Sequence, residues 1–225
     1  MKFSELPSPV IVVGMHSAGT SLLAKIVNMA GVFMIPDMPE HHEDLFFSHE
    51  INNKLMLNNQ WHVIPLMSEE AMMTKWDRFS SRIENELPQR MIEHGYNGKS
   101  AWGFKDPRTC ILLPMYLRLW PKAVVLHIKR DVNMIADSMT KIGKPKDVSV
   151  EYRKELAELY MARVALYGPQ FSGGFHELSY EDLCLHPVKV TKKLVEGLGL
   201  TLNDELLSYL QNSVYKKRIG KGGKE

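Results

Sequence analysis

The chain has 225 residues, of which 44% are hydrophobic and 24% are charged, and its formal net charge is +2. This composition is typical of a globular protein with a packed core and excludes a wholly disordered chain. The small net charge argues against a nucleic-acid-binding protein, so any anionic ligand must be held by a local arrangement of residues.

The length predicts one domain over residues 1–225, with a basic, flexible tail at 216–225. The N-terminal apolar run is too short for a signal peptide or a membrane span, which favours a cytoplasmic location. Cys110 and Cys184 are far apart and match no metal-binding spacing. We therefore expect two buried thiols and no metal site. Nothing in the sequence indicates an oligomeric state.

Short apolar runs alternate with segments of helical periodicity along the chain. Residues 9–13 are mostly β-branched and apolar on consecutive positions, as in a parallel strand buried on both faces, and we place this strand at the centre of a sheet. This pattern predicts an α/β fold, a three-layer sandwich around a central parallel β-sheet, with ligands bound beyond the carboxyl ends of the strands. Further strands are predicted at 101–105, 123–128 and 175–178, and helices at 21–30, 50–59, 68–94 (interrupted near Pro88), 111–120, 132–141, 150–167, 187–198 and 203–213.

A glycine-containing loop joins the first strand to the first helix. It reads Gly14-Met15-His16-Ser17-Ala18-Gly19-Thr20-Ser21 and has the two glycines of a GxxxxGK[ST] phosphate-binding loop, without the lysine. Backbone N–H groups, the positive end of the helix and the Thr20 and Ser21 hydroxyls could still hold a phosphate. The alternative is a turn that binds no ligand.

After the strand at 123–128, the segment Ile128-Lys129-Arg130-Asp131, followed by Ser138, resembles the 3′-phosphate site of a family of sulfotransferases. Arg130 offers a rigid fork of donors to a phosphate, and Ser138, eight residues later, adds a hydroxyl on the same side. The alternative is a surface arginine beside Asp131, which would cap the next helix.

Together these segments resemble the donor site of sulfotransferases that use 3′-phosphoadenosine 5′-phosphosulfate (PAPS). Two further motifs fall in the order of that family: Lys105-Asp106-Pro107-Arg108-Thr109, similar to its bacterial and Golgi-type members, and Leu178-Ser179-Tyr180-Glu181-Asp182-Leu183. The likeness spans about residues 9–200. It implies the P-loop NTPase-like sulfotransferase fold, PAPS as donor, 3′-phosphoadenosine 5′-phosphate (PAP) as product, and no metal.

The resemblance also assigns roles to residues of this chain. Lys105 would neutralise charge on the transferring sulfonate, a role favoured over a surface salt bridge with Asp106 because Lys105 ends a strand at the expected ligand edge. The 3′-phosphate would be bound by Arg130 and Ser138, and Tyr180 would lie beside the nucleotide. The 5′-phosphosulfate would lie on the loop that contains His16, Ser17, Ala18, Gly19, Thr20 and Ser21.

Ser17 departs from the family pattern, because relatives usually carry Lys or Arg there to stabilise the leaving phosphate oxygen. A hydroxyl supplies no positive charge at that position, so catalysis should weaken unless another group substitutes, such as Lys105, His16, Lys25 or a tail lysine.

The base for the acceptor is expected in the ionisable run His41-His42-Glu43-Asp44. Glu43 is the first choice, with His42 and Asp44 as alternatives, and a solvated acidic loop is the non-catalytic interpretation. Aromatic residues nearby could line an acceptor pocket, although core packing explains them equally well: Phe46, Phe47, Trp61 and Trp76.

The sequence therefore predicts a nucleotide-binding transferase that moves a sulfonate from PAPS to a hydroxyl or amine of a glycan or small molecule. The alternatives are a nucleotide-binding protein on a degenerate sulfotransferase fold and, less favoured because the loop lysine is absent, a P-loop kinase.

Overall fold

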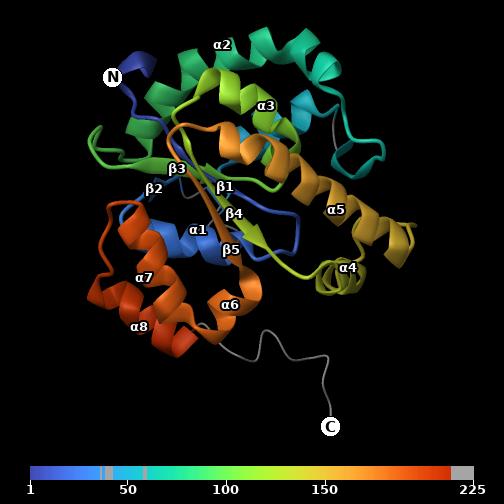
Figure 1. Ribbon diagram of the computed structural model, residues 1–225. Helices are drawn as coiled ribbons and strands as arrows, with labels where there is room; N and C mark the ends of the chain where they lie inside the picture. Colours follow the sequence, from blue (N-terminus) through green and yellow to red (C-terminus); the bar gives the residue numbers. More distant parts are fainter. Residues whose placement is uncertain (36, 39–42, 58–59, 214–225) are drawn as a thin grey trace.

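The computed structural model describes the chain apart from residues 36, 39–42, 58–59 and 214–225. The tail predicted at 216–225 lies outside the described residues. Within the described part, five parallel strands form one sheet in the order β2-β3-β1-β4-β5 (Figure 1). The predicted central place of the first strand is confirmed. The strands are β1 Val10–Val13, β2 Phe33–Met34, β3 Trp102–Lys105, β4 Val124–Lys129 and β5 Phe175–Ser179.

Helices cover both faces of this sheet (Figure 1). One face is covered by α1 Thr20–Met29, α6 Tyr180–Leu185, α7 Pro187–Gly197 and α8 Asp204–Ser213. The other carries α2 Glu69–Glu93, α3 Thr109–Leu119, α4 Val132–Lys141, α5 Val150–Tyr167 and the π-helix η2 Phe46–Asn53. Short 3-10 turns lie at η1 Phe3–Glu5, η3 Gln60–His62 and η4 Gly168–Gln170. The predicted three-layer α/β architecture is confirmed.

The side chains of β1 explain why the sheet is buried on both faces. Ile11 and Val13 belong to the core under α2 to α5, whereas Val10 and Val12 belong to the core under α1 and α6 to α8. Successive side chains of a strand point to opposite faces, so a strand that is apolar at every position stabilises both layers at once.

Two predicted helices differ from the structure. The helix 68–94 is not interrupted, and Pro88 lies inside α2. Proline removes one backbone donor, but the face of α2 that carries Ile83, Leu87 and Met91 is buried, and this packing outweighs the local loss. The helix predicted at 50–59 begins earlier, as η2, because Phe46 and Phe47 are core residues.

Two short elements were not predicted. The strand β2 has only two residues, and its pairing with β3 defines it rather than its own sequence pattern. The helix α6 directly follows β5, with the Ser179 hydroxyl accepting a hydrogen bond from the Asp182 backbone N–H.

The parallel sheet brings four chain segments to one edge. Val12 pairs with Lys105, Val13 with His127, and Lys129 with Ser179, so β1, β3, β4 and β5 end at similar heights. The segments that follow these strands therefore meet at the carboxyl edge, which is where open α/β sheets place their ligands.

Candidate active site

The loop between β1 and α1 has a shape that requires glycine at two positions. Gly19 has a φ of 101°, and a Cβ at this residue would lie 2.3 Å from a ring carbon of Tyr180. A Cβ at Gly14 would lie 2.6 Å from the Ile128 carbonyl oxygen. Among the described residues, no side chain caps the N-terminus of α1, so the positive end of this helix faces the loop. These are the features of an anion-binding turn.

Arg130 joins the end of β4 to this loop. Its Nη1 donates a hydrogen bond of 2.8 Å to the Ser17 carbonyl oxygen, and its guanidinium lies 4.6 Å from the centre of the Tyr180 ring. The Arg130 Nε is buried and has no hydrogen-bond partner among the described residues. The structure thus brings together Arg130, Tyr180 and the loop, and leaves one guanidinium donor without a partner.

The remaining residues expected to bind the donor lie around this centre. Thr20 and Ala18 are buried, while Ser17 and Ser21 are partly exposed. Ser138 lies in the second turn of α4 and is partly buried, and no hydrogen bond joins its hydroxyl to Arg130 within the described part of the chain.

Lys105 and Glu43 form an ion pair at the end of β3. The Lys105 Nζ lies 2.7 Å from the Glu43 Oε1, and the side chains are 2% and 18% exposed. A buried ammonium requires such a partner, because its transfer from water is costly. The structure therefore brings together the two residues predicted from separate segments. His42 lies outside the described residues.

His16 is the residue of the loop that feels the nearby positive charges of Arg108, Lys105 and Lys144. Its imidazole packs against the Trp61 indole in a tilted arrangement, with ring centres 4.3 Å apart and an angle of 43° between the rings, and its Nε2 is buried without a partner among the described residues. Burial, followed by the charges of Arg108, Lys105 and Lys144, lowers the pKa of His16 to about 3. The imidazole is neutral near pH 7, so it can hydrogen-bond a ligand without repelling these cations.

Asp44, the alternative base, is directed toward α2. One of its carboxylate oxygens accepts hydrogen bonds from the Phe46 backbone N–H (2.7 Å) and from Arg90 (3.3 Å). Burial raises the pKa of Asp44 to about 7. These contacts do not involve the loop, so the geometry favours Glu43 over Asp44 as the residue next to Lys105.

Of the aromatic residues considered for an acceptor pocket, Trp61 contacts the loop through His16. Phe46, Phe47 and Trp76 are buried in the core, and Phe47 stacks on Phe104 at 3.9 Å. Core packing accounts for Phe47 and Trp76, whereas Phe46 packs in the core and also lines a pocket beside α2.

A buried polar network under the site was not predicted. The Asn52 amide donates to Asp106 (2.7 Å) and Thr109 (3.0 Å), and the Tyr116 hydroxyl donates to the Asn52 side-chain oxygen (2.6 Å). Arg108 Nε contacts Asp106 at 2.9 Å. Three of its five residues, Asp106, Arg108 and Thr109, belong to the Lys105-Asp106-Pro107-Arg108-Thr109 motif, whereas Asn52 and Tyr116 belong to no motif.

In the part of the chain that the structure describes, no cluster of three or more His, Cys, Asp or Glu side chains could hold a metal ion. In the same part, no helix has the length and the apolar character needed to cross a membrane.

Comparison with solved structures identifies the fold. A sulfotransferase domain from the curacin biosynthetic pathway is 15% identical, with a TM-score of 0.58 over 93% of this chain and 80% of that chain. The sulfotransferase domain of the Synechococcus PCC 7002 olefin synthase is 16% identical, with a TM-score of 0.59 over 95% and 82%. Sulfotransferase STF1 from Mycobacterium tuberculosis H37Rv is 18% identical, with a TM-score of 0.53 over 95% and 73%. At these identities the likeness shows the P-loop-like fold alone.

The sequence itself was compared with curated proteins and with protein families. No curated protein matches the chain. The sulfotransferase family matches over residues 9–204, which include the loop, Arg130 and Tyr180 and make up most of the chain. The chain therefore belongs to the sulfotransferase family.

Proposed function

We propose that this protein transfers a sulfonate group from PAPS to a hydroxyl or amine of an acceptor, either a glycan or a small molecule. Membership of the sulfotransferase family and the fold support sulfotransferase activity. The observation that carries the choice of donor is the meeting of Arg130, Tyr180 and the loop Gly14–Ser21 at the carboxyl edge of the sheet.

The described residues suit a nucleotide that carries several phosphates. The orphaned Arg130 Nε and the uncapped N-terminus of α1 offer donors to anions. In the proposal the loop binds the 5′-phosphosulfate, Arg130 and Ser138 bind the 3′-phosphate, and Tyr180 lies beside the nucleotide. When bound, PAPS supplies the sulfonate, which passes to the acceptor as its bond to the 5′-phosphate oxygen breaks.

In the proposal the paired side chains of Lys105 and Glu43 have different roles in the transfer. The Lys105 ammonium stabilises negative charge on the sulfonate, and Glu43 removes the proton of the attacking hydroxyl or amine. A carboxylate has two oxygens, so Glu43 can accept this proton at Oε2 while its Oε1 holds Lys105. His42 is the alternative base.

Ser17 favours a second candidate function. Its side chain supplies no cation where relatives carry one, and Lys105 is already paired with Glu43. A protein that binds PAP or PAPS without transferring sulfonate would fit these two features. This candidate shares the donor site with the enzyme and differs only in turnover.

The first test is calorimetric titration of the metal-free protein with PAP, with ATP and Mg²⁺ as the comparison. We expect binding of PAP in the absence of a metal and weaker binding of ATP. Arg130→Ala should weaken PAP binding by about 100-fold, since it removes a charge-assisted contact with phosphate. Lys189→Ala, on the exposed side of α7, is the control for the loss of one positive charge. Equal PAP affinity of the Arg130→Ala variant and the original protein would contradict the assignment.

A further inference from the structure

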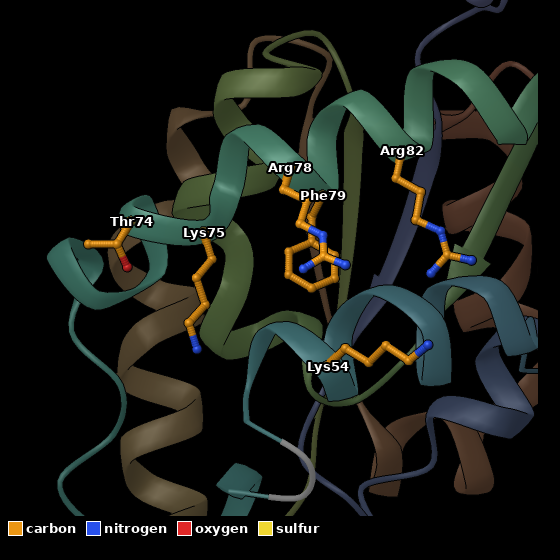
Figure 2. A pocket seen from close by; sticks show the side chains of 6 residues that line it. All are labelled: Lys54, Thr74, Lys75, Arg78, Phe79 and Arg82. Atoms are coloured by element: carbon orange, nitrogen blue, oxygen red, sulfur yellow. The ribbon is translucent and has the colours of Figure 1, made fainter.

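A pocket of about 570 Å³ lies between α2 and the segment that continues η2 (Figure 2), and none of its lining residues belongs to the loop. Its lining combines positive charge with one aromatic ring. The residues are Lys54, Thr74, Lys75, Arg78, Phe79 and Arg82.

The spacing along α2 places its three cations on one side of the helix. Lys75, Arg78, Phe79 and Arg82 are separated by three and four residues, which puts them on a single stripe. Figure 2 shows the side chains of Lys75, Arg78 and Arg82 extending from α2 toward the segment that carries Lys54. Phe79 is buried, so its ring forms an apolar wall behind the charged groups.

Acidic residues compensate only one end of this pocket. Glu50 lies 2.5 Å from the Lys54 Nζ and 3.0 Å from Arg82, and Arg82 also contacts Glu86 at 2.7 Å. Within the described residues, no ion pair involves Lys75 or Arg78. Two cations on one stripe without a counter-charge repel each other, and an anion placed between them removes this repulsion.

The neighbouring pocket on the same helix provides a contrast. Its lining contains two arginines and three glutamates, so its charges are nearly balanced, and it consists of Phe46, Glu50, Arg82, Asn85, Glu86, Gln89, Arg90 and Glu93. Of these two pockets, the one around Lys75 and Arg78 therefore has the excess of positive charge.

We propose that the pocket around Lys75 and Arg78 is a second anion-binding site, separate from the loop, for a ligand segment with two or more carboxylate, sulfate or phosphate groups. Its volume suits one or two sugar-sized units. Lysine and arginine would bind the anionic groups, and Phe79 would exclude water from one side.

If the protein is a sulfotransferase as proposed above, the pocket bears on which acceptors it can bind. The π-helix η2 contacts Asp106 through Asn52, and Lys54 follows two residues later at the pocket. One helix therefore links the end of β3 with the pocket. An acidic acceptor could occupy both, with its reacting group near Glu43 and an anionic group at Lys75 and Arg78.

The test is titration of the ¹⁵N-labelled full chain, saturated with PAP, with hexagalacturonate and separately with inorganic pyrophosphate. Fully methyl-esterified hexagalacturonate is the neutral control. We expect amide shifts confined to the region of Lys54 and residues 74–82, with either anion or both, and none with the ester. Response to one anion only would identify its group as the ligand chemistry.

The variant Lys75→Gln/Arg78→Gln should raise the dissociation constant of the responding anion by about tenfold or more. The matched control is Lys189→Gln/Lys193→Gln, which removes two charges from exposed positions on α7. This control should leave the dissociation constant of the anion unchanged. Absence of shifts around 74–82, or equal affinity of the two double variants, would overturn the proposal. Lys75→Gln/Arg78→Gln should bind PAP as tightly as the original protein, because the two residues lie outside the donor site. Failure of the donor assignment would instead appear as absence of PAP binding to the original protein.

Discussion

The Arg130 guanidinium donates a hydrogen bond of 2.8 Å to the carbonyl oxygen of Ser17, a residue 113 positions earlier in the chain. This contact fixes the end of β4 against the loop that follows β1. Ser17 has a φ of 68°, which is uncommon for a residue with a side chain, and the hydrogen bond helps to hold its carbonyl in this orientation. Ser17, which lacks a basic side chain, is thus hydrogen-bonded through its backbone carbonyl to Arg130.

Replacement of Gly19 by alanine should disrupt the loop. The added Cβ would combine a left-handed backbone with a contact of 2.3 Å to the Tyr180 ring. We expect a loss of about 2–4 kcal/mol in the free energy of unfolding, together with weakened PAP binding. Urea unfolding and calorimetry measure the two effects.

Gly31→Ala is the matched control for Gly19→Ala. Gly31 has a φ of 105°, but a Cβ there would meet no atom within 4 Å. Its loss of stability should therefore be about 1 kcal/mol, due to the backbone alone. Equal losses for the two variants would contradict the proposed close contact between Gly19 and Tyr180.

The stability of the protein should depend on pH through His16. Its pKa is about 3 in the folded chain and 6.5 in the unfolded chain, so the unfolded state binds more protons below pH 6.5. The contribution of neutral His16 to stability is therefore present above pH 6.5 and is lost as the pH falls toward 3. Linkage gives a loss of about 2 kcal/mol between pH 7 and pH 5.

Urea unfolding of the original protein and of His16→Asn at pH 5 and pH 7 measures this effect. The variant should lose less stability than the original protein between the two pH values. His127, whose pKa burial lowers to about 4, contributes in the same direction in both proteins and cancels in the comparison. Parallel pH profiles would show that His16 is not responsible.

The ion pair of Lys105 and Glu43 should show strong coupling in a double-mutant cycle. Glu43→Gln leaves a buried ammonium without its counter-charge and should cost about 1–3 kcal/mol of stability. In the Lys105→Met background the same change should cost far less. Denaturant unfolding of the four proteins gives the coupling energy, and simple additivity would show that the pair contributes nothing.

Asn52→Ala should destabilise the helix that borders the site. It removes the hydrogen bonds to Asp106 and Thr109 and leaves the Tyr116 hydroxyl without its acceptor. Buried polar groups without partners predict a loss of about 2–4 kcal/mol. Tyr116→Phe, which removes one hydroxyl from the same network, should cost about 1 kcal/mol. Thermal unfolding ranks the two variants, and the reverse order would be inconsistent with this network.

The sequence by itself determined the layers of the fold and the position of the loop. The β-branched run of β1 must be buried on both faces, and glycines followed by a helical pattern fix a strand, a turn and a helix in order. Arg130 and Tyr180 could be placed at the same edge as the loop, because each follows a strand of a parallel sheet. These inferences depend only on local periodicity and on strand direction.

Only the tertiary structure decided which side chains meet. The pairing of Lys105 with Glu43, the contact of His16 with Trp61 and the hydrogen bonds of Asn52 join residues up to 64 positions apart. Such contacts depend on how η2 and α2 pack on the sheet. The same packing keeps α2 helical at Pro88 and buries Phe46 and Phe47 in the core. Burial of apolar surface there outweighs the local backbone preferences of the sequence.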